Sequence, residues 1–524
     1  MTPSAPTIDL PTTNPESLAA IDLVHGSATA LGRWIDRLNP IFIKETRQAI
    51  KSKQFVIAFL LMLLISWLIS VIAIAAAGQR LDFGNWGRDL FSCYFVVLSG
   101  AILIIVPFTA FRSLSLERDD ATYEPLVMST LTPRQIILGK LQSAMLQVFL
   151  YYSAIAPFMA FTALLQGFDI KHVALLLVSG AFAALWCTVA ALAVCAVMTR
   201  RRTQTLVSLA VLGGLFLVFV NAWAWSFNTQ WLNWNDLAVQ LGAAVWIVGG
   251  IASIILLQQV AVINLTFPAD NRSTALRLIV QGLFVLIWLA LWLMLRVVPT
   301  PPHNGESYLV GLSFSLVLWA LAGLFFVTES DHISRRIRRE LPRRPVVRLA
   351  SWPFLPGGQR GLVLVLLNLV ILGGVIFYAA RRHGWTMQEF KLPLSLTALL
   401  YFLIYVNLAA AMTRWGMRAT HAIQPMHGRV ATVVLIAVTM SVPMFLMTFS
   451  DDYLYNSWQD FRLFYLISPI VTFEHLALTL SYAKQIVIWL SVLALLSTAL
   501  NVPAMIRGLF DLWDDRSLVE EHLP

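Results

Sequence analysis

The chain has 524 residues, of which 58% are hydrophobic and only 12% are charged, and its formal net charge is +9. A soluble domain carries roughly twice this share of charged residues, so the composition excludes a soluble globular protein. Apolar runs long enough to cross a bilayer as helices recur between Phe55 and Pro503. We therefore predict an all-α, polytopic helical membrane protein with about twelve transmembrane helices. We expect this multi-pass protein in the plasma (inner) membrane. In such a protein the positive charge marks cytoplasmic loops, and we expect no binding to nucleic acid.

The first 53 residues precede the apolar runs. Residues 1–30 lack the basic start and short apolar core of a cleavable signal peptide, and we predict a disordered cytoplasmic tail over 1–35. Residues 36–53 predict a helix in the inner membrane interface, with its cations reaching toward lipid headgroups. The alternative is that 36–53 is only the basic flank of the first span. One helix side carries Leu38, Ile41, Phe42, Ala49 and Ile50, and the other carries Lys44, Arg47, Gln48 and Lys51.

The apolar runs divide into two units of six predicted spans, residues 54–265 and 266–505, followed by a cytoplasmic tail over 506–524. The first unit has spans at 55–77, 90–111, 132–166, 173–198 and 205–225, and a sixth that ends near Leu265. The second unit has spans at 278–298, 309–327, 362–380, 394–412, 430–449 and 486–503.

A polar loop, 113–140, separates the second and third spans. It contains the order Thr132, Pro133, Arg134, Gln135, with a hydroxyl at N-cap, proline at N1 and glutamine at N3. This order is a capping box and predicts that a rigid helix begins here and continues into the membrane.

Two further segments of the second unit differ from ordinary spans. The loop 329–360 carries eight arginines and predicts a cytoplasmic anchor that contacts anionic lipid. The segment 450–482 contains a stretch apolar enough for a thirteenth span, but it also holds Pro469, Glu474 and His475, which a lipid-facing helix would avoid. We predict an outer, partly re-entrant helical hairpin there, with a thirteenth span as the alternative.

The distribution of Lys and Arg predicts the orientation of the chain. With the amino terminus in the cytoplasm and about twelve spans, 28 of the 37 Lys and Arg residues lie on the cytoplasmic side. This asymmetry agrees with the positive-inside rule, and it places the loop 113–140 in the cytoplasm.

The sequence contains no phosphate loop of the form GxxxxGK[ST], and no HExxH, GxSxG or paired Cys/His spacing. We therefore expect no catalytic residues and no metal site in this chain. Asp451 and Asp452 are adjacent acids on an outer loop and are expected to be solvated. Cys93, Cys187 and Cys195 lie in apolar runs and are expected to be small buried hydrophobes.

Two stretches resemble ABC-2-type ABC transporter permeases. The segment NPIFIKETRQAIKSKQF, with Pro40, Lys44, Glu45 and Arg47, is similar to the interfacial elbow helix that opens such permeases. The loop after the second span is similar to their cytoplasmic coupling region. The matching residues are Glu117, Arg118, Thr122, Glu124, Leu126, Ser129, Thr132, Pro133, Arg134, Gln135, Gly139, Lys140 and Leu141. Ala121 and Pro125 depart from the pattern, and such permeases usually have half the number of spans predicted here.

The resemblance implies that separate cytoplasmic ATPase subunits bind the coupling loop and carry the ATP and Mg, so that this chain itself holds no cofactor. Four charged residues of the loop would then complement charges of opposite sign on a partner: Glu117, Arg118, Glu124 and Arg134. We expect Lys140, about two turns beyond the cap, to extend to lipid headgroups.

A pair of ATPases implies a second permease chain, or a second coupling site in the loop 329–360. The alternatives from other classes are an ion-coupled secondary transporter or an integral-membrane enzyme acting on lipid-linked substrates. Either would depend on Glu474, Asp451 or Asp452. A scaffold subunit of a larger membrane assembly is a third alternative.

Overall fold

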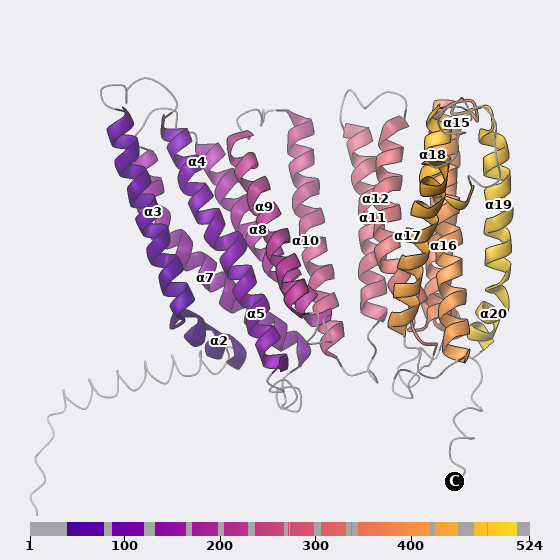
Figure 1. Cartoon of the computed structure of the whole chain (residues 1–524), viewed down its shortest axis with the longest axis horizontal. Helices are drawn as coiled ribbons and strands as arrows, with labels where there is room; N and C mark the ends of the chain where they lie inside the picture. Colours follow the sequence, from indigo (N-terminus) through magenta and orange to yellow (C-terminus); the bar gives the residue numbers. More distant parts are fainter. Residues whose placement is uncertain are drawn as a thin grey trace, which may run out of the picture. The chain divides into compact units, whose positions relative to one another are not determined.

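The structure is a computed structural model. It describes residues 39–77, 86–119, 132–163, 170–197, 204–228, 236–266, 271, 273–297, 305–331, 337, 344–419, 425–448, 466–478 and 480–510. Every regular element in these ranges is a helix, which confirms the prediction of an all-α protein (Figure 1).

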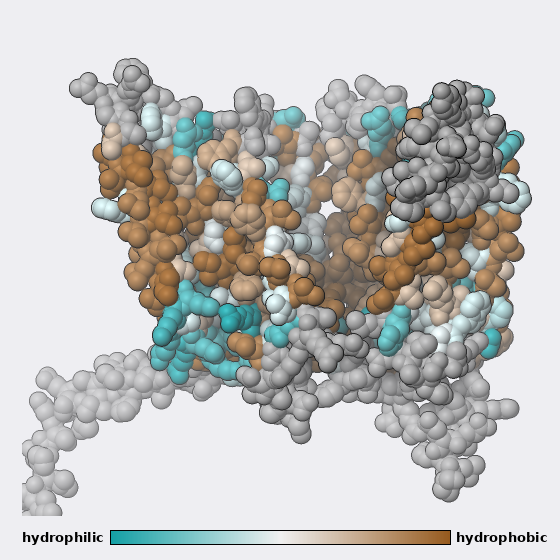
Figure 2. All heavy atoms as spheres, in the orientation of Figure 1, coloured by the Kyte–Doolittle hydropathy of each residue, from teal (hydrophilic) through white to brown (hydrophobic). Residues whose placement is uncertain are grey.

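Eleven helices in the described ranges are long and apolar enough to cross a membrane, which confirms a multi-pass membrane protein. Figure 2 shows apolar side chains along the middle of the helices and polar side chains gathered toward their ends. The predicted span 430–449 coincides with α17 (Pro425–Thr448), in which the apolar stretch His427–Pro443 is shorter than in the other spans.

The chain divides into two compact units, residues 1–232 with 260–265, and residues 233–259 with 266–524. The helix α10 (Leu237–Leu265) contributes residues to both. The other helices of unit 1 are α2 (Pro40–Ile50), α3 (Lys53–Ala77), α4 (Trp86–Ser99), η2 (Gly100–Ile105), α5 (Val106–Asp119), α7 (Pro133–Thr162), α8 (Ile170–Val197) and α9 (Gln204–Asn228).

The second span of unit 1 is continuous from α4 through η2 to α5, and η2 is a π-helical segment. The amide of Val106 donates to the carbonyl of Ala101, five residues earlier. Pro107, which has no amide hydrogen, comes directly afterwards, so the wider turn precedes a position where the α-helical hydrogen bond is lost.

Unit 2 contains α11 (Thr274–Val297), α12 (Glu306–Val327), α14 (Pro345–Ser351), η6 (Trp352–Phe354), α15 (Gly358–His383), α16 (Lys391–Ala419), α17, α18 (Pro469–Leu478), α19 (Ala483–Ala499) and α20 (Val502–Phe510). The end of α15 illustrates how the sequence fixes a boundary. Gly384 takes a left-handed conformation, with φ of 70°, and the amide of Trp385 donates to the carbonyl of Ala380 at 3.0 Å. A glycine at this position ends a helix without the steric cost of a Cβ.

The predicted outer hairpin contains the short helix α18. Its ten residues span about 15 Å, half of the hydrocarbon core, so α18 does not form a thirteenth span. The hydroxyl of Tyr401 on α16 lies 2.7 Å from that of Thr472 and donates to the carbonyl of Leu466 at 3.0 Å. These contacts and a core of Leu476, Ile486 and Leu490 hold α18 against α16 and α19.

The expectation for the cysteines is correct for two of them. Cys187 and Cys195 on α8 are buried, whereas Cys93 on α4 is exposed. Cys93 was wrongly expected to be buried because an apolar run does not show which helix face packs against protein.

Candidate functional site

The candidate site of unit 1 is formed where α2 crosses the end of α5 and the beginning of α7. The helix α2 begins at Pro40, and the side chain of Asn39 accepts a hydrogen bond from the amide of Ile41 at 3.1 Å. The Nδ2 of Asn39 also donates to the carbonyl of Gln135 at 2.5 Å. The cap of α2 is therefore attached to the first turn of α7.

The capping box at the beginning of α7 is present and confirms the predicted helix start. The amide of Gln135 donates to the Thr132 hydroxyl at 3.3 Å, and the amide of Thr132 donates to Oε1 of Gln135 at 2.8 Å. Pro133 is the first helical residue, and the side chains of Thr132, Arg134 and Gln135 are exposed. This rim of the loop is available to a partner.

Gly139 sets how closely α2 approaches α7. A Cβ at this position would lie 2.9 Å from the Cβ of Ile41 and 3.0 Å from Nδ2 of Asn39. Such distances are too short for real side chains, so only glycine permits this crossing. Gly139 of α7 thus lies directly against the start of α2.

A buried cluster of charges lies next to this crossing. Nζ of Lys140 lies 2.7 Å from Oε1 of Glu45, 3.0 Å from Oε2 of Glu117 and 2.9 Å from the Ser113 hydroxyl. The second carboxylate oxygen of Glu117 pairs with Nζ of Lys44 at 2.9 Å. The exposed fractions of the Lys140, Glu45 and Glu117 side chains are 2%, 11% and 14%. Lys44 is 54% exposed, and its charge brings the net charge of the cluster to zero, which makes the burial of the other three side chains tolerable.

The prediction that Lys140 extends to lipid headgroups is therefore wrong. Two carboxylates and a hydroxyl surround its ammonium group, and they replace the hydration that the group loses on burial. The expectation that Glu117 offers its charge to a partner is also wrong, because both of its oxygens are paired within the chain. Lys44 pairs with Glu117 rather than with headgroups alone, while Arg47 is exposed.

The surroundings of Lys44 change its pKa. Partial burial is the largest influence and lowers it, but the hydrogen bond to Glu117 and the negative charges of Glu117 and Glu45 together raise the pKa above its ordinary value of 10.5. The charged form of Lys44 is thus favoured at all physiological pH values.

A cavity of about 310 Å³ adjoins the ion cluster between α2, α5 and α7. Ser143 and Tyr151 line it, and their buried hydroxyl groups have no hydrogen-bond partner within the described ranges. Gln147 and Arg112 add polar side chains. Buried hydroxyl groups of this kind are normally satisfied by water or by a polar ligand, so this cavity is able to hold either.

Other predicted residues fall elsewhere. The side chain of Arg118, the residues Thr122 and Glu124, and the acids Asp451 and Asp452 lie outside the described part of the chain. In the hairpin, Pro469 begins α18 and is buried with His475, whereas Glu474 is exposed. The ring of His475 lies 6.1 Å from that of Tyr482.

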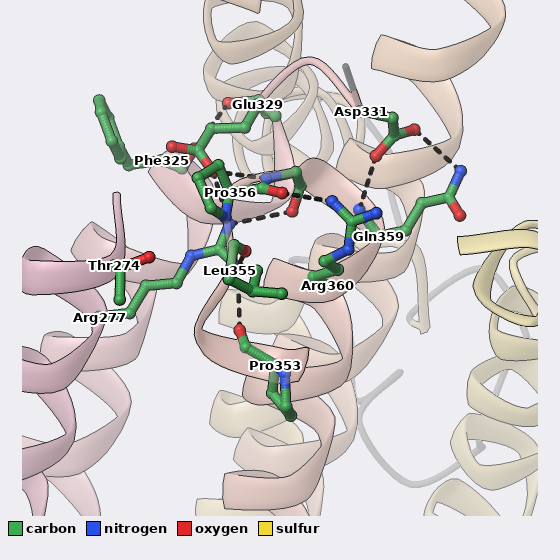
Figure 3. A network of polar contacts seen from close by, with 12 residues as sticks. Thr274, Arg277, Phe325, Glu329, Asp331, Pro353, Leu355, Pro356, Gln359 and Arg360 are labelled. Atoms are coloured by element: carbon green, nitrogen blue, oxygen red, sulfur yellow. Dashed lines mark hydrogen bonds and ion pairs between the residues drawn. The ribbon is translucent and has the colours of Figure 1, made fainter. Parts of the chain in front are cut away.

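Unit 2 has a second buried charge, which sequence reasoning did not single out. Arg277, in the first turn of α11, is fully buried, and Figure 3 shows it directed at the chain around Leu355. Its guanidinium group pairs with Glu329 at 2.5 Å and donates to the carbonyls of Pro353 and Gly357, each at 2.9 Å, and of Leu355. The five donors of a guanidinium group suit such a set of acceptors.

This arrangement corrects part of the prediction for the basic loop 329–360. Arg360 is 3% exposed and donates to the carbonyl of Pro356 at 2.5 Å, and Glu329 pairs with Arg277. Neither residue is therefore available to lipid or to a second ATPase. Asp331 is likewise used internally, accepting from the side chain of Gln359 at 2.8 Å.

Sequence reasoning also missed Asn39 and Ser113. Asn39 directly precedes a proline and a helical pattern, which is an N-cap signal. Ser113 carried no signal, because its role depends on a lysine 27 positions away. Comparison of the chain with protein-family models, with curated proteins and with solved structures finds no match.

Proposed function

We propose that this chain is the membrane-spanning permease subunit of an ATP-binding cassette transporter in the plasma membrane. Separate cytoplasmic ATPase subunits would bind the loop between α5 and α7 and supply the ATP and Mg. The observation that carries the proposal is the ion cluster of Glu45, Glu117 and Lys140, which attaches the interfacial helix α2 to both sides of this loop.

The contacts suit such a role for physical reasons. The loop is bounded by Glu117 at the end of α5 and by the capped start of α7, and the cluster joins both boundaries to α2. A displacement of the loop by a partner would therefore reach three helices at once. The exposed Arg134 beside the cap offers a positive charge for recognition, and charges at an interface rim guide association.

The first test is the identity of the partner and its activity. Tagged full-length chain, purified from its native membrane, is expected to carry a second protein with a GxxxxGK[ST] phosphate loop. In the reconstituted complex, Arg134→Glu is expected to lower substrate-dependent ATP hydrolysis severalfold, because the exposed charge at the loop rim is reversed. The chain should still fold, since Arg134 is exposed.

Arg507→Glu is the matched control, because Arg507 is an exposed arginine near the end of α20. It is expected to leave ATP hydrolysis unchanged. A chain that purifies alone, or an Arg134→Glu complex as active as the original, would contradict the proposal.

A further inference from the structure

A second cavity lies within unit 2, at the end of α11 opposite Arg277. It has a volume of about 800 Å³ and lies where α11 ends, α12 begins and α15 ends. This volume is within the range of pockets that bind small organic ligands, which is roughly 300–1,000 Å³. The side chains around it fall into three chemically distinct groups.

The first group is cationic. Arg296 at the end of α11, and Arg382 and His383 at the end of α15, line the cavity. Among the described residues, no carboxylate forms an ion pair with any of the three. Glu306, in the first turn of α12, pairs with Lys391 at 3.7 Å. The cavity therefore presents two permanent positive charges that the described protein does not neutralise.

The second group is aromatic. Trp288, Trp292, Tyr308 and Tyr378 line the cavity. The guanidinium carbon of Arg296 lies 5.8 Å from the Trp292 ring, and the Tyr308 ring lies 5.5 Å from His383. Tryptophan and tyrosine are typical of the level of the lipid headgroups, where one side of the ring is apolar and the other is wet.

The third group is apolar and continues along the helices toward the middle of the span. Leu291, Leu295, Ile371 and Val375 contribute to the wall. Gly374 also lines it, and a Cβ at Gly374 would meet no atom within 4 Å. Cations thus lie at the helix ends and an alkyl-lined space lies beside them.

The position of these cations is unusual for the chain. By the orientation that the charge count predicts, this end faces outward, where the positive-inside rule makes Lys and Arg rare. Basic residues in a last helical turn also interact favourably with the helix dipole. The helix dipole explains why each arginine is found at the end of its own helix. It does not explain why a cavity of this size with aromatic walls lies beside them.

We propose that this cavity binds an anionic amphiphile, with its phosphate or carboxylate head at Arg296 and Arg382 and its alkyl chain along α11 and α15. Guanidinium groups bind such oxyanions through paired hydrogen bonds, and the tryptophans and tyrosines cover the junction of head and chain. The proposal does not depend on an ATPase partner.

The test measures binding of defined probes to the purified full-length chain by calorimetry. Dioctanoyl phosphatidylglycerol is expected to bind at least tenfold more tightly than dioctanoyl phosphatidylcholine, which has the same chains but no net charge. Glycerol phosphate distinguishes a free anion from an amphiphile, and it is expected to bind at least tenfold more weakly than the anionic lipid. Equal affinity for the two lipids, or equally tight binding of glycerol phosphate, would overturn the proposal.

Two variants, each with a control, locate the site. The double variant Arg296→Gln/Arg382→Gln is expected to reduce the affinity for the anionic lipid at least tenfold. Arg381→Gln is its matched control, because Arg381 is adjacent but lies over Phe377, at 5.3 Å, and does not line the cavity. Affinity equal to that of the unmodified chain in the double variant would contradict the assignment.

Gly374→Leu adds an apolar side chain at the cavity wall, where a Cβ meets no atom within 4 Å, so it tests the same site without removing charge. Gly373→Leu is its control, because a Cβ at Gly373 likewise meets no atom within 4 Å and Gly373 does not line the cavity. We expect weaker lipid binding in the first variant only. Equal binding by both variants would place the lipid elsewhere.

Discussion

Lys140 occupies a position where an isolated ammonium group would be very costly. Its side chain is 2% exposed, and its charge is compensated by Glu45 and Glu117. With Lys44 the cluster is neutral, so each member depends on the other three. Removing Lys140 leaves an uncompensated negative charge on side chains that are only 11% and 14% exposed, and this predicts a large effect for this single substitution.

Lys140→Met is expected to destabilise the chain by about 3–5 kcal/mol, the usual cost of breaking a buried ion pair from one side. The loss of stability is measured as the shift in the midpoint of the unfolding transition of the protein in detergent. Lys51→Met, at an exposed lysine of the same interfacial segment, is the control and should have little effect.

Adding Glu45→Gln to Lys140→Met leaves the Lys44–Glu117 pair neutral, so the double variant should be more stable than Lys140→Met alone. Additive losses in the double variant would show that the two groups do not interact.

The raised pKa of Lys44 predicts a dependence on alkaline pH. A lysine whose pKa is raised by folding adds stability that is fully present below its ordinary value of 10.5 and is lost as the pH rises through the higher folded value. The difference in stability between the unmodified chain and Lys44→Met should therefore be constant up to about pH 10 and then shrink. Thermal unfolding across pH 8–12 measures this, and a difference that stays constant throughout would contradict it.

At the scale of elements, the spans were predictable because a helix in lipid must be apolar over its whole length. The runs at 55–77 and 173–198, for example, correspond to α3 and α8 within a few residues. The π-helical η2 was not predictable, since the residues Gly100–Ile105 are also compatible with an ordinary α-helix. The pairing of Glu45 with Lys140 was equally hidden, because 95 residues separate them and only packing brings them together.

The crossing of α2 and α7 makes a prediction about one glycine. Gly139→Ala places a Cβ against Ile41 and should destabilise the chain by about 1–3 kcal/mol, despite the better helix propensity of alanine. Gly214→Ala on α9 is the matched control, because a Cβ there meets no atom within 4 Å. It should be neutral or stabilising by up to about 1 kcal/mol. A similar midpoint shift in both variants, measured by thermal unfolding, would contradict the close crossing.

At the scale of the whole molecule, the charge asymmetry predicts which ends of the helices face the cytoplasm. Arg134 lies in the first turn of α7, a membrane-spanning helix of unit 1. Arg382 lies in the last turn of α15, a membrane-spanning helix of unit 2. The positive-inside rule assigns the first to the cytoplasm and the second to the exterior.

In a variant without Cys93, Cys187 and Cys195, Arg382→Cys should react with a membrane-impermeant thiol reagent added to intact cells, whereas Arg134→Cys should react only after the membrane is opened. The change in electrophoretic mobility caused by the attached reagent measures the reaction of each cysteine. The opposite pattern would invert the orientation and would place the loop between α5 and α7 outside the cytoplasm.

The short connection between α2 and α3 has a consequence for how the membrane-spanning helices tilt. Only Lys51 and Ser52 separate the two helices, while Asn39 and the ion cluster hold the other parts of α2 to α5 and α7. The first and third spans are thus joined through α2 at one end. When the bilayer becomes thinner, we expect a change in the tilt of one of these helices to be accompanied by a change in the other.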